Sequence, residues 1–255
     1  MNIAIITGAS SGIGKEFVQQ LPYFYKNLDE IWVIARRTKP LYALEKCSSL
    51  PIRVIAGDLG TFEIYQQIQD LLEQYRPKIR LLVNAAGFGK SGRAEHIFQT
   101  DSTAQWKMID INCRAVTQMT LLCFPYFSKG SRVIQIASAA AFFPQPGFAV
   151  YAATKAYVLS FSRALQAEWK KKGVFVTVVC PGPVDTEFFL HTGAAIPPLK
   201  KLCMTKASNV VKKALLDSKK QKRISIYGAG MKLIFSASKI IPHAWVTKIE
   251  AMGMR

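Results

Sequence analysis

Tyr151 and Lys155 are the residues whose types and spacing point most directly to chemistry. Residues four apart lie on one face of a helix, so the phenol and the ammonium can meet there. A phenol with a pKa of about 10 is a poor acid or base at neutral pH, but a fixed cation beside it favours the phenolate and lowers that pKa. We therefore expect this pair to give a proton to an oxygen atom or to take one from it.

The same spacing occurs a second time, in Tyr42 and Lys46. With nine tyrosines in the chain, roughly one such pair is expected by chance at the usual abundance of helices. No other chemically active group stands near Tyr42 in the sequence, so we interpret this second pair as an ordinary amphipathic helix face. The meaning of the Tyr151 pair depends on the elements that surround it.

Short apolar runs alternate with longer segments of helical period. Strands are predicted near residues 2–6, 31–35, 52–56, 79–83, 131–137, 174–179 and 224–227. Helices are predicted near residues 12–21, 40–49, 61–75, 101–127, 150–172 and 205–219. This alternation predicts an α/β fold, a doubly wound Rossmann-type parallel sheet of about seven strands with helices on both faces. Pro22 should end or bend the first helix.

A glycine-rich turn follows the first strand directly and opens the first helix. It reads Thr7-Gly8-Ala-Ser10-Ser11-Gly12-Ile13-Gly14. Glycines let backbone N–H groups approach a ligand closely, and a helix N-terminus favours an anion, so this turn predicts a pyrophosphate site for a dinucleotide. Its glycine spacing differs from the general G-x-G-x-x-G fingerprint, so the prediction rests on the position of the turn directly after the first strand. The residues assigned to the cofactor here are Gly8, Ser10, Ser11, Gly12, Ile13 and Gly14.

Arg36 and Arg37 stand at the end of the second strand, where NAD-binding folds place a carboxylate for the ribose 2′-hydroxyl. Two guanidinium groups suit a 2′-phosphate instead, because their planar donors match its oxygens. We therefore predict that NADP(H) is preferred over NAD(H). The alternative is a solvated basic loop.

Polar and small residues follow the next two strands. Asp58, with Leu59 beside it, is placed to contact the adenine, although an Asp after a strand is also an ordinary helix cap. After the fourth strand come Asn84, Ala85 and Gly87. Gly87 would permit close approach of the cofactor and Asn84 would hold the loop backbone, unless this segment is a plain turn.

Taken together, these motifs resemble those of the short-chain dehydrogenase/reductase family, and the likeness covers residues 2 to about 190. The motifs that carry it are Thr7-Gly8-x3-Gly12-x-Gly14, Asn84-Ala-Ala-Gly87, Asn112, Ser138, Tyr151-x3-Lys155 and Pro181-Gly182. The resemblance implies an NADPH-dependent oxidoreductase that reduces a ketone or aldehyde to an alcohol, or runs the reverse reaction. The hydride chemistry itself belongs to the cofactor.

The resemblance also implies a role for each polar residue of the site. Tyr151 would be the general acid that protonates the carbonyl oxygen, while Lys155 lowers its pKa and binds the nicotinamide ribose. Ser138 would hydrogen-bond the substrate oxygen and stabilise the charge that develops on it. Asn112 would hold a water that relays protons to Lys155.

Two further segments complete the implied site. The residues expected to contact the nicotinamide are Pro181, Gly182, Val184 and Thr186. The substrate pocket should be lined by aromatic residues of the surrounding loops, namely Phe88, Phe142, Phe143, Phe148, Phe188 and Phe189. We assign substrate contacts to Ser138, Tyr151, Phe148 and Phe188. Such a lining suits an acyl, steroid-like or aromatic carbonyl better than a sugar, although some of these rings will belong to the core.

With 255 residues, the chain has room for one large domain. We expect residues 1–190 to form the dinucleotide-binding and catalytic core, and residues 191–255 a substrate lid and basic C-terminal extension of the same domain. The family resemblance implies a homodimer or homotetramer, paired through the helices near 101–127 and 150–172.

The net charge is +18, and it is concentrated near the C-terminus. Residues 200–255 carry thirteen Lys or Arg against two acidic residues, a net charge of +11. Nucleic acid, an anionic membrane surface and acidic ligands are all electrostatically compatible partners. Residues 231–241 alternate lysines with large apolar residues, as an interfacial helix does. The alternative is a helix packed over the substrate cleft with its lysines in solvent.

Several classes of protein fit the sequence less well. Five cysteines without a Cys-x-x-Cys, and histidines without ligand spacing, argue against disulfides, structural zinc and a metal site. The first strand begins at once without a charged leader, and no apolar stretch is long enough to span a bilayer, so we expect a cytoplasmic protein. No nucleic-acid-binding motif is recognisable, so we expect no nucleic-acid partner. A dinucleotide-binding sensor or scaffold without turnover should have lost part of the Asn, Ser, Tyr and Lys set, and the set is complete.

Overall fold

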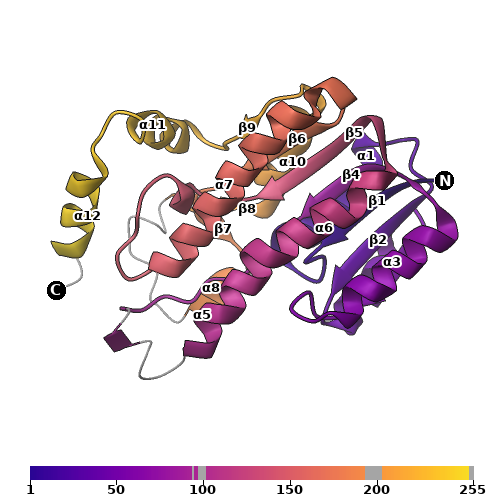
Figure 1. Ribbon diagram of the computed structural model, residues 1–255, viewed down its shortest axis with the longest axis horizontal. Coiled ribbons are helices and arrows are strands. Elements are labelled where there is room, and N and C mark those ends of the chain that lie inside the picture. Colours follow the sequence, from indigo (N-terminus) through magenta and orange to yellow (C-terminus); the bar gives the residue numbers. More distant parts are fainter. Residues whose placement is uncertain (94, 97–101, 193–202, 253–255) are drawn as a thin grey trace.

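The computed structural model describes residues 1–93, 95–96, 102–192 and 203–252. Its centre is a seven-stranded sheet in the order β3-β2-β1-β4-β5-β6-β9, in which every pair of neighbours is parallel (Figure 1). The strands are β1 (Asn2–Thr7), β2 (Glu30–Ala35), β3 (Ile52–Ala56), β4 (Lys78–Asn84), β5 (Phe127–Ile136), β6 (Phe175–Val179) and β9 (Ile224–Ser225). A separate two-stranded sheet pairs β7 (Val184–Asp185) with β8 (Thr205–Lys206). The predicted Rossmann-type sheet is confirmed.

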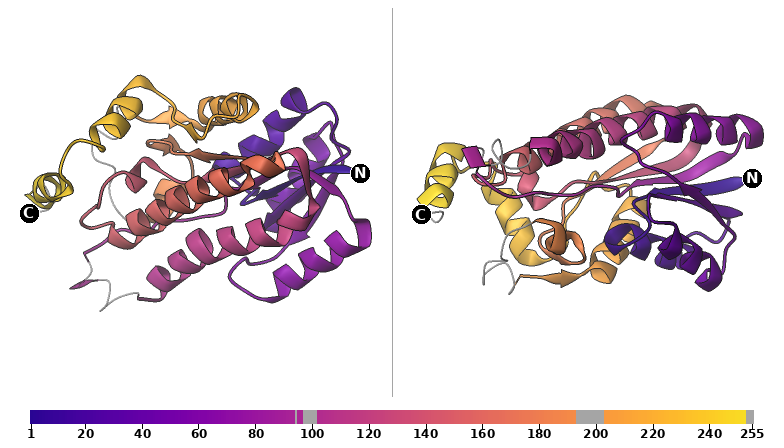
Figure 2. Two further views of the ribbon diagram at one scale, coloured as in Figure 1. Left: turned by 45° about the horizontal axis from the view of Figure 1, so that its top comes forward. Right: turned by 90° about the horizontal axis from the view of Figure 1, so that it is seen from below.

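Helices cover both faces of the sheet. One face carries α1 (Gly12–Phe24), α2 (Thr38–Cys47) and α10 (Ala207–Lys219), and the other carries α3 (Glu63–Tyr75), α6 (Ala115–Cys123) and α7 (Ala149–Trp169) (Figure 2). Side chains alternate along a strand, so β1 sends Ala4 and Ile6 into one core and Ile3 and Ile5 into the other. All four are fully buried, which explains why the strands read as continuous apolar runs.

Two predicted helices differ from those observed. α1 continues through Pro22 to Phe24, and the Tyr25 N–H still donates to the Leu21 carbonyl at 2.9 Å. The helix thus continues for two residues beyond Pro22, because a proline this close to the C-terminus removes a single hydrogen bond from the helix. The predicted bend stays a prediction. The single helix predicted near 101–127 is α5 (Ser102–Ile109), a π-helical turn (Asp110–Arg114), α6 and a 3-10 turn (Phe124–Tyr126), after which β5 begins.

The segment after residue 190 was predicted as lid and extension, and it also completes the core. Helix α10 packs against α1 and β6, and β9 adds the last strand. The remaining helices are α8 (Phe188–Thr192), α11 (Ala229–Ala237) and α12 (His243–Met252). α11 and α12 lie beyond the sheet, at the end of the molecule away from the N-terminus (Figure 1). Within the described residues, no helix has the length and apolar character needed to cross a bilayer.

The order of the strands reverses between β1 and β4, and this is where an open parallel sheet forms its ligand crevice. Thr7 at the end of β1 lies in register with Asn84 at the end of β4, which in turn lies in register with Gln135 of β5. The loops that carry the predicted site residues all leave the sheet from this edge.

Candidate active site

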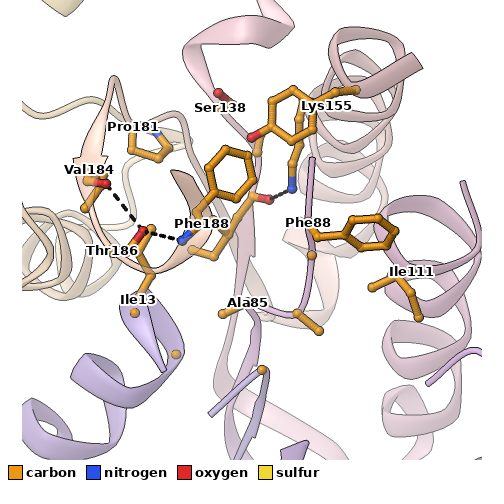
Figure 3. Close-up of a pocket in the computed structure, with 18 of the residues that line it drawn as sticks. Ile13, Ala85, Phe88, Ile111, Ser138, Lys155, Pro181, Val184, Thr186 and Phe188 are labelled. Atoms are coloured by element: carbon orange, nitrogen blue, oxygen red, sulfur yellow. Dashed lines mark hydrogen bonds between the residues drawn. The ribbon is translucent and has the colours of Figure 1, made fainter. Parts of the chain in front are cut away.

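A cavity of about 1200 Å³ lies at the carboxyl ends of the strands. Residues from both halves of the predicted site line it, from the glycine turn to Tyr151 and Lys155 (Figure 3). The predicted residues that line it are Gly8, Ser10, Ser11, Gly12, Ile13, Gly14, Arg36, Arg37, Asp58, Leu59, Ala85, Gly87, Ser138, Phe148, Tyr151, Lys155, Pro181, Gly182, Val184, Thr186 and Phe188. Asn84 and Asn112 lie behind the wall of the cavity.

The glycine turn is built for close backbone contact. Gly8 has a φ of +67°, and a Cβ on it would lie 2.7 Å from the backbone of Ala86. A Cβ on Gly14 would collide with the carbonyl oxygen of Gly8, so the first turn of α1 packs directly on the loop. Ser11 caps α1 without a side-chain hydrogen bond, and the first turn carries no acidic residue. Its N–H groups are therefore available to an anion.

Thr7, rather than Asn84, holds the loop that follows β4. Its hydroxyl accepts hydrogen bonds from the N–H groups of Ala85 and Ala86, both at 3.1 Å. The Asn84 amide instead donates to Thr120 and Gln135, both at 3.0 Å, and ties strand ends to α6. The role predicted for Asn84 is wrong, because its side chain points into the core, where it is buried. Only the β1–β4 register brings the Thr7 hydroxyl to the loop.

The two arginines at the end of β2 have acidic partners. Arg36 Nη1 lies 3.7 Å from Asp58 Oδ2, and Arg37 Nη2 lies 2.8 Å from Glu187 Oε2. Arg37 also donates to the Ser10 hydroxyl at 3.3 Å, which joins the glycine turn to the segment after β7. All four charged side chains are substantially exposed. Sequence reasoning missed Glu187, since nothing in the sequence places it opposite β2.

Asp58 does not cap a helix. Its Oδ1 accepts the Gly60 N–H at 2.9 Å, while α3 begins only at Glu63. The helix-cap alternative is therefore wrong, and the Oδ2 atom of this turn residue remains directed toward Arg36. The predicted adenine contact stays a prediction.

Tyr151 and Ser138 form the polar centre of the substrate end. Tyr151 is only 7% exposed, and the Ser138 Oγ accepts the Ala140 N–H at 3.1 Å. Burial raises the pKa of Tyr151 to about 12, and the neighbouring Ser138 side chain opposes that rise. The prediction of a lowered pKa is wrong in this arrangement, because removal from water outweighs every attractive contact. The phenol is therefore neutral at pH 7.

Lys155 is buried beside this centre and is directed toward the sheet. Its Nζ donates to the Ile136 carbonyl at 3.0 Å and lies 5.7 Å from the centroid of the Tyr151 ring. Burial lowers the pKa of Lys155 to about 8, and the nearby thiols Cys113 and Cys180 oppose this fall. The same burial raises the pKa of both thiols. The ammonium is therefore the only charged group of this cluster at pH 7.

Asn112 positions a loop through its side chain. It lies in the π-helical turn, fully buried, and its Oδ1 accepts the Phe88 N–H at 3.1 Å. Its Nδ2 donates to the Phe88 carbonyl at 2.9 Å and to the Thr154 hydroxyl at 3.0 Å. Both amide hydrogens of Asn112 are thus engaged, whereas its Oδ1 accepts one hydrogen bond and has a second lone pair. The predicted water relay stays a prediction. Thr154, missed in the sequence, is the residue that joins Asn112 to the backbone of Tyr151.

Aromatic rings surround Tyr151. Phe148 stacks on it at a centroid distance of 4.3 Å, and Phe188 lies at 5.4 Å. Five of the six predicted phenylalanines line the cavity, and the sixth, Phe142, is buried against Phe235 of α11. Met231 and Ile234 of α11 and Val246 of α12 also line it. The alternative of a helix packed over the cleft is therefore correct for α11.

A metal ion requires a set of ligand side chains close together. In the described part of the chain, no group of three or more His, Cys, Asp or Glu side chains could hold a metal ion.

Comparison with known proteins places this geometry in context. The family model described as short chain dehydrogenase matches residues 2–195. The chain is 34% identical over 192 residues to very-long-chain 3-oxoacyl-CoA reductase-B of Danio rerio, and 31% identical over 189 residues to 17-beta-hydroxysteroid dehydrogenase type 3 of Homo sapiens. Each alignment covers 72% of this chain, and 60% and 59% of the two relatives. The chain thus spans about 60% of the length of these curated relatives.

Solved structures share the fold at low sequence identity. A short-chain dehydrogenase from Sphingobium yanoikuyae in complex with NADPH superposes with a TM-score of 0.78 at 24% identity, covering 94% of both chains. The 3-ketoacyl-(acyl-carrier-protein) reductase from Brucella melitensis, complexed with NADH, also gives 0.78, at 20% identity, covering 90% of this chain and 98% of that one.

Proposed function

The chain belongs to the short-chain dehydrogenase family. From that premise we propose that it is an oxidoreductase that reduces an apolar carbonyl compound to an alcohol with NADPH, or runs the reverse reaction. One observation carries the proposal. Ser138 and the buried side chains of Tyr151 and Lys155 line a cavity that also contains the glycine turn and the arginine pair. Proton donor, cofactor cradle and apolar pocket therefore share one space.

The residues at the sheet edge fit a nicotinamide dinucleotide. The first turn of α1 would receive the pyrophosphate, because no side chain caps its N–H groups and Gly12, Ile13 and Gly14 line the cavity. Thr186 faces Gly12, so the segment after β7 would close over the nicotinamide end. When bound, the cofactor supplies the hydride.

Tyr151 would deliver the proton. With a pKa of about 12 it carries its proton at neutral pH, as a donor to a developing alkoxide must. Ser138 would hold the substrate oxygen beside the phenol. The Lys155 ammonium would stabilise the tyrosinate left after transfer, since a nearby cation favours the anionic form.

The substrate would be an acyl or steroid-like carbonyl compound. Phe88, Phe148 and Phe188 give the pocket an apolar wall on the substrate side. The names of the two relatives describe carbonyl or alcohol groups on apolar skeletons, which supports this class. A panel of 3-oxoacyl thioesters, steroid ketones and keto sugars, followed by loss of NADPH absorbance, tests it. The proposal expects turnover of the first two groups, and turnover confined to sugars would contradict the substrate class.

NADPH would be preferred over NADH through Arg36 and Arg37. Binding of each nucleotide, measured by fluorescence titration, should show tighter binding of NADPH, with the gap shrinking in Arg36→Ala and Arg37→Ala. Lys46→Ala, which removes an exposed cation at the far end of α2, is the control and should leave the gap unchanged. Equal binding of both nucleotides by the wild type would refute the assignment.

The enzyme would work in the cytoplasm as a homodimer or homotetramer. All five cysteines are unpaired, which supports a reducing compartment. Large side chains are exposed on the helices that the family resemblance pairs, among them Trp106, Leu121 and Tyr157. Burial of these residues against a second copy would remove their apolar surface from water.

A further inference from the structure

Large apolar side chains are exposed on α11, on α12 and on the connection between them. Leu233 is 72% exposed, Ile240 84% and Trp245 68%. Monomeric proteins rarely display such residues together unless the surface meets a partner or a membrane. Exposed lysines flank them in the sequence, namely Lys232, Lys239 and Lys248. We call these six residues the tail face.

The charge of the tail face has one sign. The sequence contains no Asp or Glu between residues 218 and 249, although seven Lys or Arg lie in that span. An apolar surface edged with lysines matches a bilayer with anionic headgroups, where the rings and aliphatic chains enter the interface and the ammonium groups meet phosphate. Two tail faces brought together by a two-fold axis would instead oppose lysine to lysine.

The inner side of the same helices belongs to the cavity. Met231, Ile234 and Val246 line it, and Phe143 contacts His243 with ring centroids 5.7 Å apart. The tail face and the cavity wall are thus two sides of one pair of helices. A surface applied to the tail face lies next to this wall of the cavity.

We propose that the tail face docks on an anionic lipid bilayer, so that apolar ligands reach the cavity from the membrane side. The docking surface rests on the exposed side chains and their charge, whereas the entry of ligands rests on the proposed function. Vesicle binding needs no turnover, so failure of the docking and failure of the proposed reaction can be told apart.

Co-sedimentation of the full chain with vesicles tests the docking. We expect binding to phosphatidylcholine vesicles with about 30% phosphatidylglycerol to exceed binding to pure phosphatidylcholine by at least about tenfold at low salt. The triple variant Leu233→Ser, Ile240→Ser, Trp245→Ser should lose most of this binding. The control variant Tyr23→Ser, Phe62→Ser removes apolar groups of similar exposure elsewhere and should bind like the wild type.

Tryptophan fluorescence identifies the surface that enters the lipid. Anionic vesicles should shift the emission of the wild type to the blue, and Trp245→Phe should abolish the shift. Trp106, 59% exposed on α5, provides the matched control, and Trp106→Phe should keep it. Wild-type binding no stronger than that of the triple variant overturns the proposal. A second result also overturns it: the wild type does not bind vesicles and the triple variant has a smaller oligomer mass than the wild type. A second copy of the chain would then cover the tail face.

Discussion

Replacing Lys155 with Met should stabilise the cofactor-free protein at pH 7. The side chain is buried, and its only hydrogen bond in the described structure goes to the Ile136 carbonyl. Met has a similar length and no charge, so it removes the buried ammonium and keeps most of the volume. The variant isolates the energetic consequence of burying this charge.

The magnitude follows from the pKa. Burial lowers it from 10.5 to about 8, and at 1.36 kcal/mol per pH unit the charged form is disfavoured in the folded state by about 3 kcal/mol. Loss of the hydrogen bond to Ile136 offsets about 1 kcal/mol of the gain. The net expectation is a free energy of unfolding about 2 kcal/mol higher in Lys155→Met at pH 7.

The difference in the free energy of unfolding between Lys155→Met and the wild type should change in one direction with pH. Below pH 8 Lys155 is protonated in both the folded and the unfolded chain, so the penalty is complete. Between pH 8 and 10.5 the unfolded chain binds more protons, and the stability of the wild type rises with pH until the penalty has gone. The advantage of the variant should therefore shrink above pH 8 and reverse before pH 10.5.

Urea unfolding followed by tryptophan fluorescence at pH 7, 8, 9 and 10 measures this difference. Lys46→Met, at an exposed position of α2, is the control and should show a small difference that does not vary with pH. A Lys155→Met protein less stable than the wild type at pH 7, or a difference constant across the series, would refute the claim that Lys155 is a desolvated cation.

Three further changes test the cofactor end and the assembly. Gly14→Ala should weaken NADPH binding by about tenfold or more, because its Cβ would collide with the Gly8 backbone. Gly230→Ala, which has open space at its Cβ, is the control. Equal NADPH binding by the two variants would count against the packed glycine turn. Glu187→Gln should tighten NADPH binding roughly two- to fivefold and leave NADH unchanged, because the carboxylate competes for Arg37; an equal effect on both nucleotides would exclude this competition. Leu121→Glu should reduce the mass measured by light scattering to that of the monomer, whereas an unchanged mass would place the interface elsewhere.

The parallel sheet and many residues of the cavity wall were predictable because local chemistry determines them. Apolar runs such as Ile3 to Ile6 identify buried parallel strands, and a glycine turn after the first of them identifies the phosphate end. Residues that follow strands of a parallel sheet then meet at one edge. This is why positions as distant as Arg36 and Val184 line one cavity.

What the sequence did not reveal depends on tertiary packing. The hydroxyl of Thr7 replaces the amide of Asn84 as the loop anchor because β1 and β4 pair in one particular register. The pKa of Tyr151 rises instead of falling because aromatic neighbours exclude water, and burial cannot be read from a Tyr-x3-Lys spacing. Met231 lines the cavity because α11, which lies far along the chain, passes beside it.

The proton-donor role of Tyr151 is tested most directly by single-turnover reduction with Tyr151→Phe, using NADPH and the best ketone of the substrate panel. The ring remains and only the hydroxyl is lost, so NADPH should bind as in the wild type. The rate of hydride transfer should fall by about 10² to 10⁴. Equal rates for the two proteins, with equal NADPH binding, would contradict the account.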